Sequence, residues 1–309
     1  MSADTVLKVD RLVKYFGRRR VINELSLEVQ AGEVYGFLGP NGSGKTTTIK
    51  MILGLLSVDA GTITIAGYDR EKQYEKALSN IGGIVENPDT YGYLTAKGNL
   101  RLYQRAHGAP DEARIDEVLG LVGLTARAKD RVRRYSLGMK QRLGLAQAIL
   151  HHPKVLILDE PTNGLDPAGI RELRDILKNL AHGEGLAVLV SSHLLSEMQL
   201  MCDRVCIIDK GSSLAVRDIE EMMQNGGDAN QRLQLSPADR ALEWIRANMP
   251  DKLVRQEDDT FDMALDKEEL SGLIKNLVMN DVSVLSVSAI SRTLEDSFME
   301  ITGGGNDIA

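Results

Sequence analysis

Nine consecutive residues carry the spacing G-x-x-x-x-G-K-[ST], which is suited to binding phosphate groups. They are Gly39, Pro40, Asn41, Gly42, Ser43, Gly44, Lys45, Thr46 and Thr47. Residues 34–38 read as a buried strand, and the residues from Thr46 onward as a helix with an apolar face, which is the context that the motif requires. Glycines let backbone N–H groups point at phosphates, and the helix N-terminus presents its positive end to the same anions. The stretch predicts a nucleoside triphosphate site, in which Lys45 reaches the β- and γ-phosphates and the Thr46 hydroxyl ligates Mg²⁺.

Two adjacent carboxylates follow a second apolar run. Residues 155–158 are Val-Leu-Ile-Leu, and Asp159 and Glu160 come directly after them. A central strand that ends beside the phosphate loop would place Asp159 where it holds Mg²⁺, directly or through water. Glu160 would then be free to polarise the attacking water. The alternative is a surface acidic pair after a core strand.

Composition describes an ordinary globular protein. The chain has 309 residues, 43% hydrophobic and 26% charged, which fits one large domain or two modest ones. Its net charge of −7 argues against nucleic acid or an anionic membrane as the main partner. No apolar run approaches the roughly 18 residues that a membrane span needs, and the first residues lack the apolar core of a signal peptide. Cys202 and Cys206 have no second pair for a zinc site, so we expect free core thiols in a reduced compartment, the cytoplasm.

The order of expected elements is β–α in the middle of the chain. Residues 5–30 alternate apolar and polar positions, which predicts short antiparallel strands interrupted by a turn at residues 15–17. Residues 61–67 indicate a further strand pair, and residues 94–150 are mostly helical in period. Residues 155–159 and 187–190 read as buried parallel strands with a helix at 169–180 between them. This alternation predicts an α/β domain around a parallel sheet.

A second, smaller domain is expected after a linker at residues 221–230. Residues 231–302 give the order strand, helix, strand, strand, helix, strand and short helix, which predicts an α+β domain, with a ferredoxin-like arrangement as one candidate. Residues 303–309 are expected to be a flexible tail.

Residues 135–142, Tyr-Ser-Leu-Gly-Met-Lys-Gln-Arg, resemble the signature of the ATP-binding cassette (ABC) family, usually Leu-Ser-Gly-Gly-x-Gln. With this motif the resemblance covers residues 5–216 in the family's order. Residues 161–166 resemble the D-loop, His193 the switch histidine, and Phe16 an aromatic residue that stacks on adenine. The resemblance implies a P-loop NTPase fold at residues 1–220. Its parts are a RecA-like core, an antiparallel β subdomain and a helical signature subdomain at about residues 87–150.

The resemblance further implies a sandwich dimer with two ATP molecules and Mg²⁺. Ser136 and Gly138, with Gln141 of the same motif, would contact the ATP held by the other protomer at its Lys45. Only the closed dimer supplies both sets of contacts, so ATP would favour closure. His193 would hold the γ-phosphate, Glu160 and the water in line, although a lone histidine is more often an ordinary core or surface residue. Asp166 would communicate across the dimer, and an N-cap role is compatible with that.

Two positions depart from the family pattern. Glu86 stands where a Mg²⁺-contacting glutamine is usual, so we expect Glu86 near the metal, and Leu137 replaces a signature glycine. Both features resemble the bacterial branch that exports, or confers immunity to, peptide antibiotics such as bacitracin and lantibiotics. Residues 293–298 resemble the end of the C-terminal extension found on many such exporters.

The sequence therefore predicts an ATP-hydrolysing subunit of a bacterial ABC exporter. We expect a homodimer on a separately encoded transmembrane permease, peripheral to the cytoplasmic face of the cell membrane, with no nucleic acid partner. The alternatives are a soluble cassette ATPase of translation or DNA repair, and a non-catalytic regulatory cassette. A basic run at residues 127–134 is either a solvated face or a contact with acidic loops or lipid headgroups.

Overall fold

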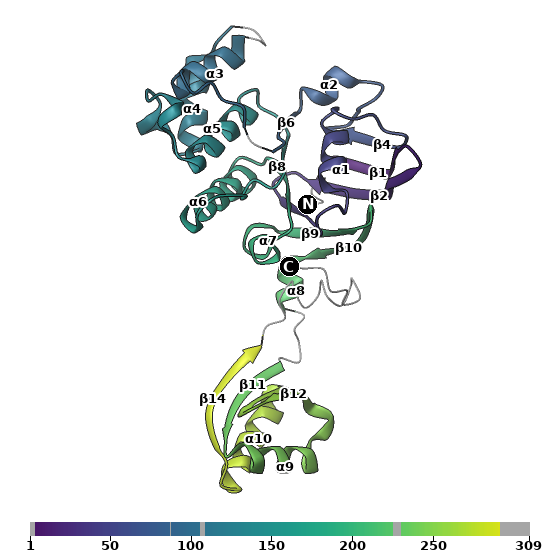
Figure 1. Ribbon diagram of the computed structural model, residues 1–309, viewed down its shortest axis with the longest axis vertical. Helices are drawn as coiled ribbons and strands as arrows, with labels where there is room; N and C mark the ends of the chain where they lie inside the picture. Colours follow the sequence, from purple (N-terminus) through teal and green to yellow (C-terminus); the bar gives the residue numbers. More distant parts are fainter. Residues whose placement is uncertain (1–3, 87, 106–108, 225–229, 291–309) are drawn as a thin grey trace. The chain divides into compact units, whose positions relative to one another are not determined.

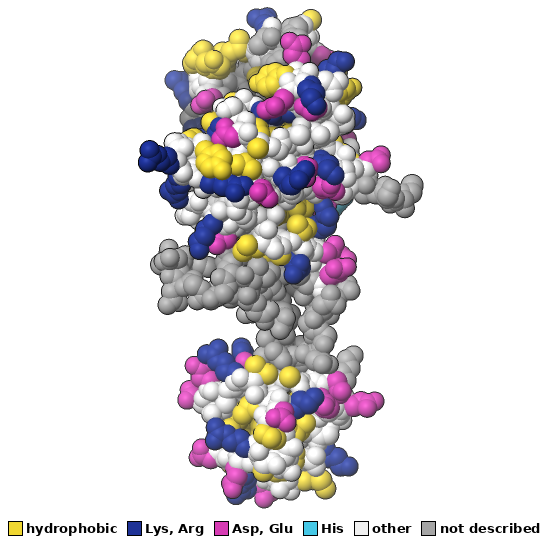
Figure 2. Space-filling model, turned by 90° about the vertical axis from the view of Figure 1, so that its right-hand side faces the viewer, with side chains coloured by type: hydrophobic (Ala, Val, Ile, Leu, Met, Phe, Trp, Pro, Cys, Tyr) yellow, Lys and Arg dark blue, Asp and Glu magenta, His cyan; other side chains and the backbone are white. Residues whose placement is uncertain are grey.

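The computed structural model describes residues 4–86, 88–105, 109–224 and 230–290 (Figure 1). The chain divides into two compact units, the first ending at Ile219 and the second beginning at Glu220. Basic and acidic side chains are interspersed over the face of each unit drawn in Figure 2. None of the helices in the described part of the chain is long and apolar enough to cross a bilayer.

A six-stranded sheet forms the centre of the first unit, in the order β10-β9-β3-β8-β7-β6. Its strands are β3 (Val34–Leu38), β6 (Ile81–Ile84), β7 (Val155–Leu158), β8 (Ala187–Ser192), β9 (Arg204–Asp209) and β10 (Ser212–Asp218). All pairs are parallel except β9 with β10. Every residue of β3, β7 and β8 is buried, which is why these strands are continuous apolar runs in the sequence. The predicted parallel strands are confirmed.

A second sheet is antiparallel, in the order β2-β1-β4-β5. Its strands are β1 (Thr5–Phe16), β2 (Arg19–Gln30), β4 (Ala60–Ile65) and β5 (Tyr68–Asp69). The expectation of short strands with a turn at residues 15–17 is wrong, because β1 and β2 are 12 residues each and β1 includes Tyr15 and Phe16. The chain reverses at Gly17 and Arg18, and the φ of 59° at Gly17 suits glycine.

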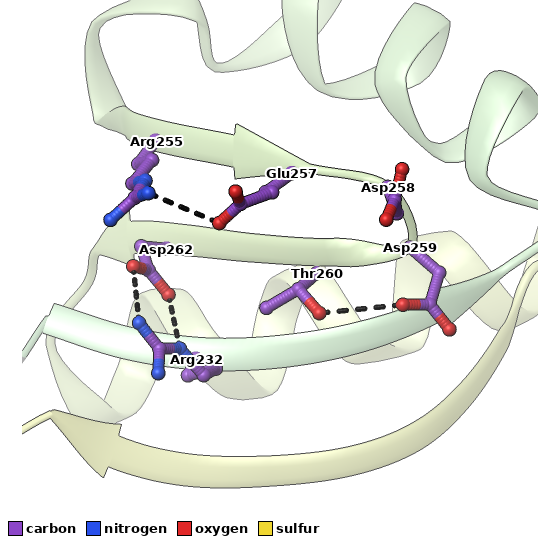
Figure 3. Close-up of a pocket in the computed structure, with 7 residues that line it drawn as sticks. All are labelled: Arg232, Arg255, Glu257, Asp258, Asp259, Thr260 and Asp262. Carbon is purple, nitrogen blue, oxygen red and sulfur yellow. Dashed lines mark hydrogen bonds and ion pairs between the residues drawn. The ribbon is translucent and has the colours of Figure 1, made fainter.

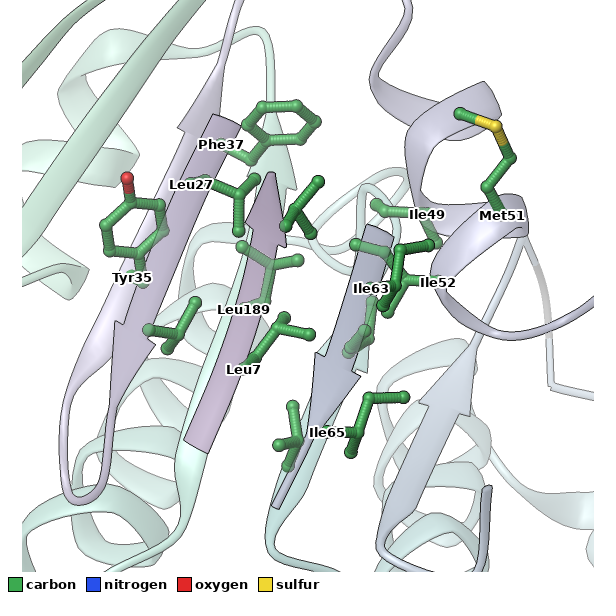
Figure 4. Packing of buried hydrophobic residues seen from close by; sticks show 14 of the residues in the cluster. Leu7, Leu27, Tyr35, Phe37, Ile49, Met51, Ile52, Ile63, Ile65 and Leu189 are labelled. Carbon is green, nitrogen blue, oxygen red and sulfur yellow. The ribbon is translucent and has the colours of Figure 1, made fainter. Parts of the chain in front are cut away.

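The main core of the first unit lies between these two sheets and the first helix. Leu7, Leu27 and Ile63 of the antiparallel sheet face Phe37 of the central sheet and Ile49 of α1 (Figure 4). Figure 4 shows the apolar side chains of the strands and the helix pointing into one shared layer. This packing fixes the end of β3 and the start of α1, the two elements that carry the phosphate loop.

The helices of the first unit cover the sheets and form a separate group between β6 and β7. The bounds are α1 (Lys45–Ile52), α2 (Tyr74–Leu78), α3 (Ala96–Arg105), α4 (Glu112–Leu121), α5 (Leu137–Ile149), α6 (Pro167–Lys178) and α7 (Leu195–Met201). Helix α8 (Ile219–Gln224) begins at the boundary between the two units. Short 3-10 helices at Thr125–Arg127 and Val132–Arg134 precede α5, and a π-helical turn at Asn179–Gly183 extends α6. Helices α3, α4 and α5 lie together in Figure 1, as expected for the helical subdomain.

The second unit has the order βαββαβ. Its elements are β11 (Asn230–Ser236), α9 (Ala238–Asn248), β12 (Leu253–Glu257), β13 (Thr260–Ala264), α10 (Lys267–Met279) and β14 (Ser283–Ile290), with a 3-10 turn at Pro250–Lys252. The fully antiparallel sheet has the order β12-β13-β11-β14, which is the ferredoxin-like arrangement. Leu233, Phe261 and Met263 face the helices and form a core with Ile245 and Leu277.

The expected linker is partly structured. Helix α8 reaches Gln224, and β11 begins at Asn230. The helix forms at the start of the expected linker because its first turn carries two acidic residues, which suit a helix N-terminus. The remaining linker residues, the motif at residues 293–298 and the expected tail at 303–309 lie outside the described residues.

Candidate functional site

The phosphate loop runs from the end of β3 to the first turn of α1. Gly42 and Gly44 have φ values of 79° and 110°, a region that glycine adopts without strain. At Gly39 a Cβ atom would lie 2.3 Å from the carbonyl oxygen of Ile208, so only glycine fits there. The sequence therefore places glycines where the loop backbone needs a positive φ or passes close to its neighbours, as in loops that bind phosphate groups.

Lys45 is buried at the start of α1 and bonds back to its own loop. Its Nζ donates to the carbonyl oxygens of Gly39 at 2.7 Å and Pro40 at 3.3 Å, and lies 3.4 Å from Glu160 Oε1. The nearby Ser43 Oγ is buried without a hydrogen-bond partner among the described residues. An ammonium held by carbonyl oxygens and an unsatisfied hydroxyl are groups that a phosphate would satisfy, so the residues present fit a nucleotide.

A connected group of side chains stands at the ends of β7 and β8. Leu158 pairs with Val190 in parallel register, which sets Asp159 beside Ser191. Ser191 Oγ donates to Asp159 Oδ1 at 2.6 Å and accepts from the Glu160 N–H at 2.9 Å.

Glu160 links this group to the phosphate loop. Its Oε2 lies 2.9 Å from His193 Nδ1, while Oε1 faces Lys45. The backbone of Glu160 has a φ of 48°, which is unusual for a non-glycine residue and typical of functional sites. The structure thus brings together the three predicted catalytic residues Lys45, Glu160 and His193.

A cavity of about 440 Å³ opens over this group. Six loop residues line it, namely Asn41, Gly42, Gly44, Lys45, Thr46 and Thr47, together with Glu160 and His193. Gly39, Pro40 and Ser43 do not line the cavity. The carbonyl oxygens of Gly39 and Pro40 accept hydrogen bonds from Lys45, and the Ser43 hydroxyl is buried. Arg19 and Val21 also line the cavity, and sequence reasoning missed them, as it missed Ser191. Asn163, from the stretch that resembles the D-loop, lines the cavity as well. The parallel register of β7 and β8 is the signal that could have indicated Ser191.

Two residues that were predicted to contact the nucleotide or metal bound by the same chain do not line the cavity. Phe16 is 50% exposed, with Lys14 Nζ 6.0 Å from its ring centroid, and it does not line the cavity. Glu86 has a 74% exposed side chain and lies 3.4 Å from Lys50 Nζ on α1. Adenine stacking by Phe16 and metal contact by Glu86 remain predictions.

The signature residues begin α5. Ser136 is its N-cap, with Oγ accepting from the Met139 N–H at 3.3 Å, while Gly138 follows in the first turn and Gln141 is buried. Asp166 caps α6 in the same way through the Gly169 N–H at 3.0 Å. None of these predicted residues lines the cavity around Lys45.

The two cysteines are outside this site. Both are free and buried, as predicted. Burial raises the pKa of the Cys206 thiol to about 12, and it raises the pKa of Cys202 as well. Because the thiolate is the reactive form, both side chains are inert at neutral pH.

A second cavity, of about 450 Å³, lies on the open face of the sheet in the second unit (Figure 3). Four of its charged side chains form two ion pairs, Arg232 with Asp262 at 2.7 and 2.8 Å and Arg255 with Glu257 at 3.1 Å. Figure 3 shows the Arg232–Asp262 pair bridging β11 and β13, and the Arg255–Glu257 pair lying along β12. This surface is a solvated polar sheet face.

Comparisons with known proteins agree with the geometry. Residues 22–163 match the family described as ABC transporter. The ABC transporter ATP-binding protein YhcH of Bacillus subtilis (strain 168) is 47% identical, over 97% of this chain and 96% of that protein. The bacitracin transport ATP-binding protein BcrA of Bacillus licheniformis is 39% identical, over 97% and 98%. A solved ATP-binding subunit of an ABC transporter has 31% identity and a TM-score of 0.63, over 72% of this chain and 94% of that one. The chain therefore belongs to the ABC transporter family, as an ATP-binding and ATP-hydrolysing subunit that serves a transmembrane partner.

Proposed function

We propose that two copies of this chain close around two ATP molecules and power a bacterial exporter through a separately encoded transmembrane permease. One observation carries the proposal. The cavity that holds Lys45, Glu160 and His193 is not lined by Ser136 or Gly138. The N-terminus of α5 and its exposed Ser136 are therefore free to complete the site of a second copy.

The chain's own residues account for phosphoryl transfer to water. Lys45 would exchange the two loop carbonyl oxygens for phosphate oxygens, which are stronger partners for an ammonium. Glu160 would accept the proton of the attacking water at the carboxylate that His193 holds. Fixed charges and dipoles of this kind supply most of the acceleration in phosphoryl transfer.

The metal would be held by few protein groups. Thr46 lines the cavity, and Asp159 is a buried carboxylate that shares the Ser191 hydroxyl with the N–H of Glu160, which lines the same cavity. These two residues are the proposed Mg²⁺ ligands. Glu86 remains the third candidate. A bound Mg²⁺ would neutralise charge on the β- and γ-phosphates, and it characteristically takes its other ligands from phosphates and water.

The cargo and location are inferred from the relatives and the composition. BcrA is named for bacitracin transport, and we propose efflux of an antimicrobial peptide or a similar amphipathic antibiotic. The subunit would sit peripherally at the cytoplasmic face of the cell membrane, on its permease. The net charge of −7 argues against a nucleic acid partner. The names of the two relatives described above do not point to translation or DNA repair.

The test is capture of the tagged chain from its native membranes, with ATPase activity measured in the captured material. We expect a hydrophobic membrane subunit, activity stimulated by bacitracin or a lantibiotic, and no activity for Glu160→Gln. Ser136→Arg should abolish hydrolysis while the isolated subunit still binds ATP, because the serine acts on the partner's nucleotide. Thr125→Arg, at another exposed helix start of the same helical group, is the matched control and should keep activity. Capture of ribosomes or DNA in place of a membrane subunit would overturn the proposal.

A further inference from the structure

Two leucine side chains of the first unit each lie against a glycine of another segment. Leu137 is the first residue of α5, and its Cδ2 atom lies 3.1 Å from the point where a Cβ atom on Gly164 would stand. In return, the Cδ2 atom of Leu165 lies 3.8 Å from the point where a Cβ atom on Gly138 would stand. The start of α5 therefore packs directly on the turn that precedes α6, because each leucine occupies space that a glycine leaves open.

The turn that carries Gly164 is tied to the ATP cavity. The Asn163 N–H donates to the Glu160 carbonyl oxygen at 3.2 Å, and both residues line the cavity. The Leu165 N–H donates to the Thr162 carbonyl oxygen at 3.1 Å. Because these two bonds overlap along the chain, a displacement of Gly164 is passed to Asn163 and to the backbone of Glu160.

The other end of this contact belongs to the second ATP site. Ser136 is the N-cap of α5 and directly precedes Leu137. Under the function proposed above, Ser136 contacts the ATP that a second copy holds. Leu137 itself is 42% exposed and does not line the cavity of its own chain. It therefore stands between a group that senses one nucleotide and a turn that positions the general base for the other.

We propose that Leu137 is a positioning residue that couples the two ATP sites. ATP held by one copy draws in Ser136 of the other, and Leu137 passes this shift through Gly164 to Glu160 of its own chain. The inference rests on the proposed closure of two copies around ATP. Coupling of this kind needs a packed contact whose arrangement both sites influence, and the leucine–glycine packing supplies one.

The test uses membrane-captured complexes that contain two differently tagged copies. One copy carries Glu160→Gln, so that only the other copy hydrolyses ATP. We expect Leu137→Ala in the hydrolysing copy to lower kcat roughly threefold or more, the size typical of a contact that transmits coupling. The same substitution in the Glu160→Gln copy should lower kcat less. The ATP dissociation constant of the isolated subunit should not change, because Leu137 does not line the cavity.

Two further variants separate coupling from a general loss of packing. Leu102→Ala on α3 is the matched control, because Leu102 is 41% exposed in the same helical group, and it should keep kcat in either copy. Leu137→Met retains a long apolar side chain and should recover most of kcat. Thermal unfolding of all three variants should match the parent chain, since both leucines are substantially exposed.

The ATP dependence of hydrolysis gives a second measurement, in complexes whose two copies are identical. We expect cooperative hydrolysis in the parent and a Hill coefficient that falls toward ~1 in Leu137→Ala. An unchanged Hill coefficient, or a parent without cooperativity, overturns the inference.

The complexes with two tags distinguish this inference from the function on which it rests. A larger loss of kcat when Leu137→Ala sits in the Glu160→Gln copy overturns the inference, because Leu137 would then act directly on the nucleotide that Ser136 contacts. In that case the closure of two copies around ATP still stands. Capture of complexes that never contain both tags removes the proposed closure itself, and the inference with it.

Discussion

Replacing Ser191 with alanine removes the hydroxyl that joins the two carboxylate residues at the end of β7. Ser191 is fully buried, and its Oγ bonds to Asp159 at 2.6 Å and to the Glu160 N–H at 2.9 Å. A bond to a charged group contributes about 1.5–3 kcal/mol and a neutral one about 0.5–1.5 kcal/mol. We therefore expect Ser191→Ala to lower the free energy of unfolding by roughly 2–4 kcal/mol.

The same substitution should slow hydrolysis. Glu160 has a φ of 48°, a conformation that costs about 1–3 kcal/mol and persists because its surroundings hold it. Without the bond from its N–H to Ser191, Glu160 can relax and move relative to Lys45 and His193. A displacement of about 1 Å in a catalytic group can reduce the rate by about 100-fold, so we expect kcat to fall roughly 10- to 100-fold.

The assay compares kcat, the ATP dissociation constant and the unfolding free energy in three variants. Ser192→Ala is the control, because Ser192 is also buried but its Oγ accepts from the Leu194 N–H at 3.0 Å. It should lose about 1 kcal/mol of stability and keep kcat within about threefold. Ser191→Thr retains the hydroxyl and should recover most of kcat.

Two results would refute the reasoning. A Ser191→Ala variant with reduced stability and unchanged kcat would mean that the hydroxyl is structural only and does not position Glu160. A variant unchanged in both would mean that neither hydrogen bond contributes. A fall in kcat with an unchanged ATP dissociation constant is the signature that we expect.

Two further predictions concern the cavity and the core. Arg19→Gln should raise the ATP dissociation constant about three- to fivefold, the size expected for one screened cation near a triphosphate, and equilibrium binding would measure it. Arg18→Gln, an adjacent exposed residue outside the lining, should bind ATP as the parent does, and equal losses in both would contradict a specific role for Arg19. Burial raises the pKa of Cys206 from 9.0 to about 12, so the folded chain keeps a proton that the unfolded chain loses in this range. Stability should therefore be intact below pH 9 and fall as the pH rises toward 12, by up to about 1.4 kcal/mol per pH unit for this group. Cys206→Ala should flatten that slope in alkaline unfolding experiments, and an unchanged slope would contradict it.

Much of the first unit could be predicted because its signals are local. The central strands are buried on both faces, so residues 155–158 and 187–190 had to be continuous apolar runs. The glycine spacing of residues 39–44 reports a loop geometry that few other residues can adopt. The α+β order of the second unit followed from similar periodic patterns.

What could not be predicted depends on pairing between distant segments. Ser191 has no motif of its own, and its role arises only because β7 and β8 lie in parallel register. The length of β1 and β2 was underestimated, since their mutual pairing carries the strands through positions where local patterning suggested a turn. Strand order likewise cannot be read locally, so the positions of β12 and β14 at the edges of their sheet emerge only in the folded structure.

The ion pair between Lys45 and Glu160, 3.4 Å apart, makes ATP binding an exchange, in which existing partners are replaced. Because two carbonyl oxygens and a carboxylate already contact this lysine, the affinity for ATP reflects the difference between two sets of bonds. Counting only the contacts of the bound state would overstate the affinity for ATP. Under the proposed roles, the exchange also has a timing consequence. The carboxylate of Glu160, which activates water, is paired with Lys45 until a phosphate replaces it as the partner of the lysine. Binding of the substrate therefore makes the general base available.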